Sequence, residues 1–177
     1  MICGAGGIVK KTRHADEASL KNFKGLGEIA LFDHLERTPE SQPLLQMAHW
    51  QKLEIENYVC TREILLQYAF DPSGSAEDDL VQRAEGRGRR QAMEAAIART
   101  EAALIDLNKG SPWDAGFKVS DDFLAPLFAT FYRTLKLSNT MLKTNFHRIA
   151  AVLHKDEVHP EVIGMLDAIV AQATLAG

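Results

Sequence analysis

The sequence predicts an all-α protein, an antiparallel helical bundle of four long helices plus a shorter C-terminal helix. Apolar residues recur at helical spacing through most of the chain, most clearly between Val119 and Glu157, and no segment alternates apolar and polar residues as a half-buried strand does. A length of 177 residues fits one domain. We therefore expect a single helical-bundle domain over residues 16–177, preceded by a mobile, glycine-rich lead-in over residues 1–15.

Composition and charge exclude several classes of protein. Hydrophobic residues at 46% and charged residues at 25% are ordinary globular values, which argues against disorder. The net charge of −4 gives no overall attraction to nucleic acid or anionic lipid, so neither partner is expected. No apolar run approaches about 18 residues, so no membrane span is expected. Cys3 and Cys60 could pair, but reduced thiols in a cytoplasmic protein are the favoured interpretation.

The first predicted helix covers residues 16–36. Asp16 can cap its start. Five apolar side chains form its inner face: Leu20, Phe23, Leu26, Ile29 and Ala30. Gly25 and Gly27 lie in the middle, where each glycine costs about 1 kcal/mol relative to alanine. The helix is therefore expected to bend there, or to admit a close neighbour.

The second predicted helix, over residues 42–70, is apolar on two sides. Pro43 suits its first turn. Its main face carries Leu44, Leu45, Met47, Ala48, Ile55, Tyr58, Val59, Leu65, Leu66 and Ala69. A second apolar line on the opposite side carries Trp50, Leu53, Cys60, Ile64 and Tyr68, of which the first four are the expected interface residues. A helix with two apolar sides lies at the centre of a bundle or shares one side with another subunit. We expect a homodimer that forms through this second line.

The third predicted helix covers residues 76–108 and ends near Gly110. Glycine is common there because many helices end with a residue in the left-handed backbone conformation. Its apolar face is formed by Met93, Ala96, Ile97, Thr100, Ala103, Leu104 and Leu107. The arginine-rich segment RAEGRGRR near its start suggests a phosphate or nucleic-acid contact. A solvated charged face is favoured, because Glu85 interrupts the run and no aromatic stacking partner is near.

The fourth predicted helix, over residues 120–156, is the longest and organises the bundle. Ser120 caps its start, and Pro126 lies within its first turns. One side carries Leu124, Leu127, Phe128, Phe131, Leu135, Leu142, Phe146, Ile149, Val152 and Leu153. The other side is basic and carries His147 and His154. A final helix over residues 159–175 follows.

Arg62 and Gln51 break the apolar stripe of the second helix. A charge in such a stripe is costly unless it is paired. The favoured interpretation is a helix edge where Arg62 extends to water. The alternative is a ligand-binding polar cluster within the bundle, formed by Arg62, Gln51, His49, Glu56 and Tyr68.

Established catalytic and metal-binding patterns are missing from the sequence. No Glu-x-x-His pair occurs, so a ferritin-type metal site is not expected, although a ferritin-like overall shape remains open. His147, His154 and His159 are interpreted as solvent-facing, with loose metal binding as the weaker alternative. Cys60 has no histidine at a local helical spacing, which argues against a nucleophilic thiol. We expect no metal and no cofactor.

These observations support two functions. The leading hypothesis is a non-enzymatic helical binding or interaction protein that self-associates. The alternative is a helical bundle with a polar interior pocket around Arg62 that binds a small ligand or metal, with catalysis there left open.

Overall fold

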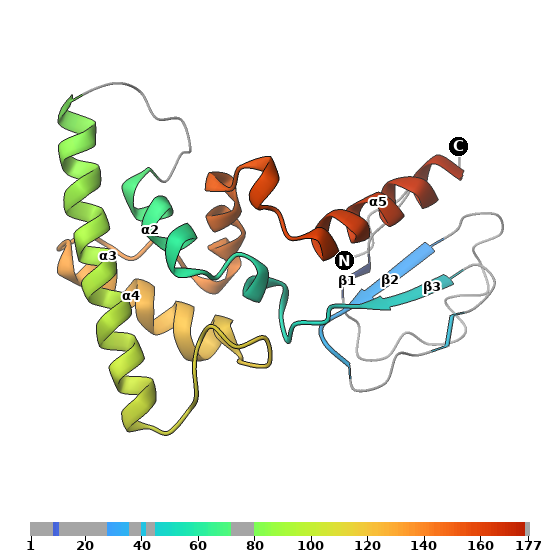
Figure 1. Cartoon of the computed structure of the whole chain (residues 1–177), viewed down its shortest axis with the longest axis horizontal. Helices are drawn as coiled ribbons and strands as arrows, with labels where there is room; N and C mark the ends of the chain where they lie inside the picture. The colour runs from blue at the N-terminus through green and yellow to red at the C-terminus, as the bar shows by residue number, and fades with distance from the viewer. Residues whose placement is uncertain (1–8, 11–27, 36–39, 42–44, 72–79, 176–177) are drawn as a thin grey trace. The chain divides into compact units, whose positions relative to one another are not determined.

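The computed structural model describes residues 9–10, 28–35, 40–41, 45–71 and 80–175 (Figure 1). The chain forms two compact units. We call residues 1–51 and 159–177 the sheet unit, and residues 52–158 the helical unit. Most of the predicted lead-in lies outside the described residues, and Val9–Lys10 within it form a strand.

The sheet unit contains a parallel β-sheet, so the predicted all-α bundle is wrong. Its strands are β1 (Val9–Lys10), β2 (Glu28–Phe32) and β3 (Leu45–His49). The strands lie in the order β1-β2-β3, and both pairs are parallel. The helix α5 (Pro160–Leu175) contacts β2 and confirms the predicted C-terminal helix.

The predicted helices over residues 16–36 and 42–70 fail where these strands form. The segments EIALF and LQMAH are five residues each. Periodicity alone does not separate a strand from a helix in so short an apolar run. Parallel strands also tend to be buried on both faces and therefore lack the alternation that marks a half-exposed strand. The proposed bend at Gly25 and Gly27 lies outside the described residues.

The helical unit is built from short helices around one long helix. Its elements are η1 (Ile55–Tyr58), α2 (Arg62–Phe70), α3 (Leu80–Asp106), η2 (Ser120–Leu124), α4 (Ala125–Thr134), η3 (Lys143–Val152) and η4 (Lys155–Glu157). The helix α3 packs against both α2 and α4, and η3 packs against α2. Fully buried side chains from all four meet in the core: Leu65, Met93, Ile97, Leu127, Phe128, Phe146 and Ile149.

The predicted helix over residues 76–108 is confirmed as α3 in its described part. Of the predicted apolar face, Met93, Ala96, Ile97, Thr100 and Leu104 are buried, whereas Ala103 and Leu107 near its end are exposed. The chain turns after Asp106 through Asn108 and Gly110, whose φ values are 54° and 82°. Asparagine and glycine are the residues that most readily adopt this left-handed conformation, so the end of α3 was readable from sequence.

The predicted helix over residues 120–156 is wrong, because it breaks after α4. Lys136 has a φ of 58°, which no right-handed helix accommodates. Asn139 Oδ1 then accepts a hydrogen bond from Met141 N at 2.9 Å, a local contact that competes with helix formation. The chain resumes as the 3₁₀-helix η3. Phe146, Ile149 and Val152 are all buried in η3, and their spacing of three matches three residues per turn.

A buried polar cluster fixes η1 to the start of η2. The Glu54 carboxylate accepts hydrogen bonds from Ser120 N and Ser120 Oγ, both at 2.9 Å. Asn57 Nδ2 donates to Phe117 O at 3.0 Å, and Asn57 Oδ1 accepts from Glu54 N at 2.9 Å. Phe117 itself lies in the core. The segment before α2 is therefore held by polar contacts and not by a helical stripe.

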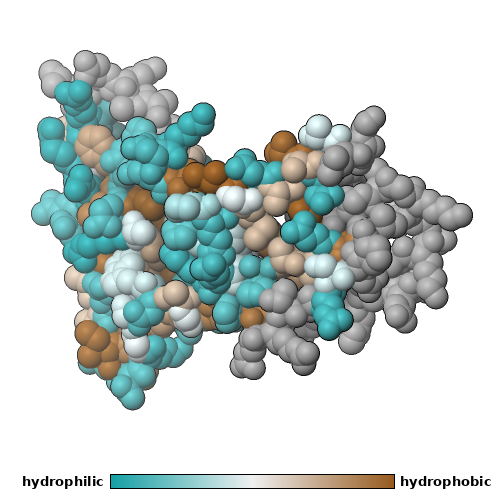
Figure 2. Space-filling model, turned by 45° about the vertical axis from the view of Figure 1, so that its right-hand side comes forward, coloured by the Kyte–Doolittle hydropathy of each residue, from teal (hydrophilic) through white to brown (hydrophobic). Residues whose placement is uncertain are grey.

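On the face shown in Figure 2, the described residues are mostly hydrophilic, with separate hydrophobic patches among them. Among the helices of the described residues, none combines the length and the apolar character that a bilayer span requires.

Candidate functional site

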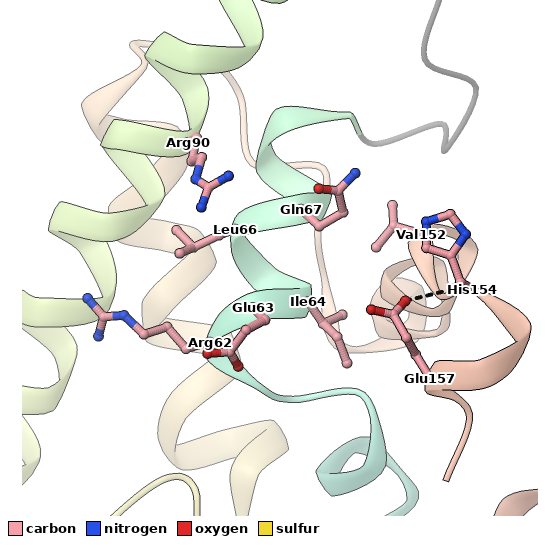
Figure 3. A pocket seen from close by; sticks show the side chains of 9 residues that line it. All are labelled: Arg62, Glu63, Ile64, Leu66, Gln67, Arg90, Val152, His154 and Glu157. Carbon is pink, nitrogen blue, oxygen red and sulfur yellow. Dashed lines mark hydrogen bonds between the residues drawn. The ribbon is translucent and has the colours of Figure 1, made fainter.

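A cavity of about 430 Å³ lies in the helical unit, between α2, α3 and the segment that joins η3 to η4 (Figure 3). This volume falls within the range of pockets that bind small molecules. It is lined by Arg62, Glu63, Ile64, Leu66, Gln67, Arg90, Val152, His154 and Glu157. We call it the Arg62 pocket. It combines an apolar surface with charged and amide groups, as binding sites do.

The helix α2 gives the pocket its composition. Leu65, Tyr68 and Ala69 are buried in the core, whereas Arg62, Glu63, Ile64, Leu66 and Gln67 line the pocket. Thr61 fixes the start of α2, because its Oγ1 accepts a hydrogen bond from Ile64 N at 3.3 Å. A second wall follows the end of η3, where His154 N donates to Glu157 Oε2 at 2.8 Å and holds the short turn η4 in place.

Arg62 is partly exposed and paired with the neighbouring helix. Its side chain is 40% exposed, and its guanidinium lies 3.5 Å from Glu101 Oε2 and 3.8 Å from Glu94 Oε1. Both glutamates belong to α3, toward which Arg62 points in Figure 3. Trp113 Nε1 donates to the other Glu101 oxygen at 2.8 Å. Arg62 therefore joins α2 to α3, and a chain of polar contacts connects it to an indole ring.

The arginine-rich segment RAEGRGRR has unequal roles along α3. Arg89 Nε donates to Ala69 O at 3.1 Å, and its NH2 donates to Phe70 O at 3.0 Å. Arg89 thus donates hydrogen bonds to carbonyl groups at the C-terminus of α2. Its positive charge also interacts favourably with the helix dipole at that end. Arg90, the next residue, is exposed and lines the Arg62 pocket.

Only Arg62, of the five residues of the predicted polar cluster, lines this pocket. Glu56 is half-buried in η1 and Tyr68 is buried in the core, where it packs edge-on against Phe128. His49 and Gln51 belong to the sheet unit. The predicted cluster presupposed one continuous helix, and the strand β3 replaces its first part. The pocket residues Gln67, Arg90, His154 and Glu157 were missed, because packing and not sequence spacing brings them together.

Two histidines meet at the carboxyl end of the parallel sheet. His34 Nδ1 and His49 Nδ1 lie 3.2 and 2.9 Å from the same oxygen, Trp50 O. Since a carbonyl oxygen only accepts, each Nδ1 carries a proton. The two rings lie edge to face, with their centroids 5.8 Å apart. Among the described residues, no three His, Cys, Asp or Glu side chains form a group that could hold a metal ion.

The predicted dimer line is dispersed over different elements. Trp50 and Cys60 are 5% and 4% exposed within the chain itself. Leu53 and Ile64 are half-buried, and Leu53 N donates to Ala115 O at 2.8 Å. The helix face that was to align the four residues does not form. A contact of these residues with a second copy stays a prediction.

Two buried groups titrate away from their ordinary range. Burial raises the pKa of the Cys60 thiol, against a smaller opposing effect from Lys52. Burial also raises the pKa of Tyr68 to about 12, and a hydrogen bond with Tyr132 adds to this effect. Neither group ionises near neutral pH, so neither is an activated nucleophile or base.

The predicted solvent-facing histidines are confirmed, because His147, His154 and His159 are all exposed. His154 is the one of the three that lines the Arg62 pocket.

Comparisons of the chain with protein-family models, with curated proteins and with solved structures find no match.

Proposed function

We propose that this chain is a non-enzymatic binding protein that holds a small molecule in the Arg62 pocket. The observation that carries the proposal is the cavity itself, about 430 Å³ in volume. Ile64, Leu66 and Val152 supply apolar contact area, and the surrounding side chains supply hydrogen-bond donors and acceptors. Such a combination suits an amphipathic ligand, whose apolar part leaves water while its polar part stays hydrogen-bonded.

Binding is proposed in preference to catalysis because the groups with displaced pKa values are unreactive. The Cys60 thiol is buried, and its raised pKa keeps it protonated. Tyr68, with a pKa of about 12, is likewise neutral and packed in the core. Perturbed groups that support catalysis lie in a cleft, with a pKa near the working pH.

A blocked pocket tests this proposal. Gln67 is exposed at the pocket, so Gln67→Trp should fill the space without disturbing the core. Gln91→Trp is the matched control, because Gln91 is exposed on α3 outside the lining. We expect a fragment library to yield compounds that raise the melting temperature of the wild type and of Gln91→Trp, and that have no effect on Gln67→Trp. A library without hits, or hits that Gln67→Trp leaves unchanged, would refute the proposal.

Trp113 offers a second readout of the same site. It contacts Glu101, and Glu101 contacts Arg62. Trp50→Phe leaves Trp113 as the chain's single indole, since the sequence contains two tryptophans. A ligand that binds beside Arg62 should change the fluorescence of Trp113 in this variant, and Arg62→Ala should abolish the change.

Self-association is our second proposal, and α5 now supports it. Ile163, Leu166 and Val170 are 42%, 53% and 63% exposed, and their spacing places them on one side of the helix. We propose a homodimer in which this side of α5 contributes to the contact. Leu166→Glu should yield a monomer by light scattering, whereas Ile105→Glu, at an exposed position of α3, should not. A wild-type monomer would end this proposal.

We also propose that the protein acts in the cytoplasm, without nucleic acid. A free thiol at Cys60 suits a reducing compartment. The net charge of −4 disfavours polyanions, and Arg89 of the arginine-rich segment is occupied by α2. Retention of the chain on a heparin column at physiological salt would argue against this assignment.

A further inference from the structure

We propose that the ligand of the Arg62 pocket is an amphipathic organic anion with one charged head. The head would lie against Arg90 and the apolar body against Ile64, Leu66 and Val152. This inference rests on the proposed function, and it adds the chemical class of the ligand.

Arg90, one of the two arginines that line the pocket, belongs to a flank of α3 that carries other arginines. Arg83, Arg87 and Arg90 follow at spacings of four and three, so they share a side of the helix, and all three are exposed. Like charges at this spacing repel one another. Further along the same flank, Glu94 and Glu101 hold Arg62. The acidic part of the flank is therefore matched by a cation, whereas Arg90 has no hydrogen bond or ion pair with the described residues.

Arg90 is the member of this flank that faces the pocket. It lines the cavity and points from α3 toward Leu66 (Figure 3). With the described residues of the chain it makes no hydrogen bond or ion pair, in contrast to Arg62 and Arg89. A guanidinium presents a planar fork of donors that matches a carboxylate or a phosphate. The Gln67 amide, on α2 beside Leu66, offers a further donor.

Two carboxylates limit the ligand to one charged head. Glu157 is held by His154 N at 2.8 Å, and Glu63 is exposed next to Arg62. Both carboxylates lie apart from Arg90 in Figure 3. A second negative charge of the ligand near Glu63 or Glu157 would therefore be repelled. Leu66, Ile64 and Val152 supply the apolar part of the lining, which favours an uncharged body.

Four probes of equal chain length separate charge from apolar contact. Octanoate, octyl phosphate, octanol and octylamine share one apolar body, and we would measure the binding of each to the full chain by titration calorimetry. We expect octanoate or octyl phosphate to bind at least about tenfold more tightly than octanol, because a charge-assisted hydrogen bond exceeds a neutral one. Octylamine should bind least. The better of the two anions identifies the head group as carboxylate or phosphate.

Arginine variants locate the head. Arg90→Gln should remove most of the preference for the anion over octanol while leaving octanol binding unchanged. Arg99→Gln is the matched control, because Arg99 is exposed on α3 outside the lining, and it should retain the preference. Arg90→Lys should retain part of it, since a lysine keeps the charge but loses the fork.

The outcomes distinguish the two proposals. Equal binding of octanol and octanoate, with both lost in Gln67→Trp, would overturn the anion assignment and leave the pocket as a binding site. An anion preference that survives Arg90→Gln would also overturn the assignment. Failure of all four probes to bind at millimolar concentration would overturn this inference, and the fragment library would then decide the proposed function separately.

Discussion

Gly86 controls how closely α3 approaches the end of α2, and a single methyl group tests this. A Cβ atom added at Gly86 would lie 2.8 Å from Phe70 O and 3.0 Å from the Phe70 ring. A Cβ added at Gly88, one half-turn further along the same helix, would have no heavy atom within 4 Å. Gly86→Ala and Gly88→Ala therefore make the same chemical change in the same helix, and only the first creates a steric clash.

The magnitude follows from two opposing effects. Replacing glycine by alanine inside a helix stabilises the folded state by about 0.5–1 kcal/mol, and both variants gain this. At Gly86 the nearest atom is a backbone oxygen, which cannot move away by a change of rotamer. Overpacking of this kind costs about 1–3 kcal/mol. Because the helix gain cancels between the variants, Gly86→Ala should be about 1–3 kcal/mol less stable than Gly88→Ala, and Gly88→Ala should exceed the wild type.

Urea unfolding in the Trp50→Phe background measures this difference. Trp113 then reports on the helical unit alone, and equal m values would show that only stability has changed. For a chain of this size, 1 kcal/mol corresponds to about 2–4 °C in melting temperature. A Gly86→Ala variant as stable as Gly88→Ala would refute the close contact between α2 and α3.

The same displacement should reach the pocket. Arg89 donates to Ala69 O and Phe70 O only because the end of α2 lies against α3. The neighbouring residues Leu66 and Arg90 line the pocket from these two helices. Gly86→Ala should therefore also weaken ligand binding, whereas Gly88→Ala should leave it unchanged.

Three further predictions concern stability and reactivity. Asn57→Ala should destabilise the helical unit by about 1–3 kcal/mol in urea unfolding, because it leaves the buried Phe117 carbonyl without its donor. Asp121 has its pKa lowered to about 2, first by the hydrogen bond from Lys118. It therefore contributes stability above pH 3.8 that is lost as the pH falls toward 2, and Asp121→Asn should flatten the acid limb of the stability profile. Cys60 in a Cys3→Ser variant should react with a thiol reagent only as fast as the native state opens, and rapid labelling would contradict its burial.

Part of the fold was readable from local signals. The helix α3 has a long apolar face and ends just before Asn108 and Gly110. The helix α5 begins with a proline. Long periodic segments with clear ends carry enough local information to define a helix. The strands β2 and β3 carry no such information, because each is stabilised by pairing with the other, Glu28 opposite Leu45 and Phe32 opposite His49.

The break after α4 illustrates the limit of helical periodicity. Leu135 and Leu142 continue the apolar phase of α4, and the predicted helix ran through them for that reason. In the structure Leu142 is 60% exposed, the chain turns at Lys136, and residues 137–142 have no regular secondary structure. A periodic pattern records where apolar residues would lie if the chain were helical, and it does not weigh the competing side-chain contacts.

The candidate site also contains residues that the sequence indicated and residues that it did not. Arg62 was identified from sequence because a charge in an apolar stripe needs partners, and the structure supplies Glu94 and Glu101. Arg90 and Glu157 had no comparable signal, since each lies on a different element from Arg62.

The sequence by itself determined the helices α3 and α5, the overall negative charge and the anomaly at Arg62, because each depends on neighbours in the chain or on composition. Only the tertiary structure decided that residues 28–32 and 45–49 are strands, and that α3 and η4 approach α2 to enclose a pocket. Strand pairing and pocket formation satisfy hydrogen bonds and bury surface between residues far apart in sequence, and these energies appear only once the chain has folded.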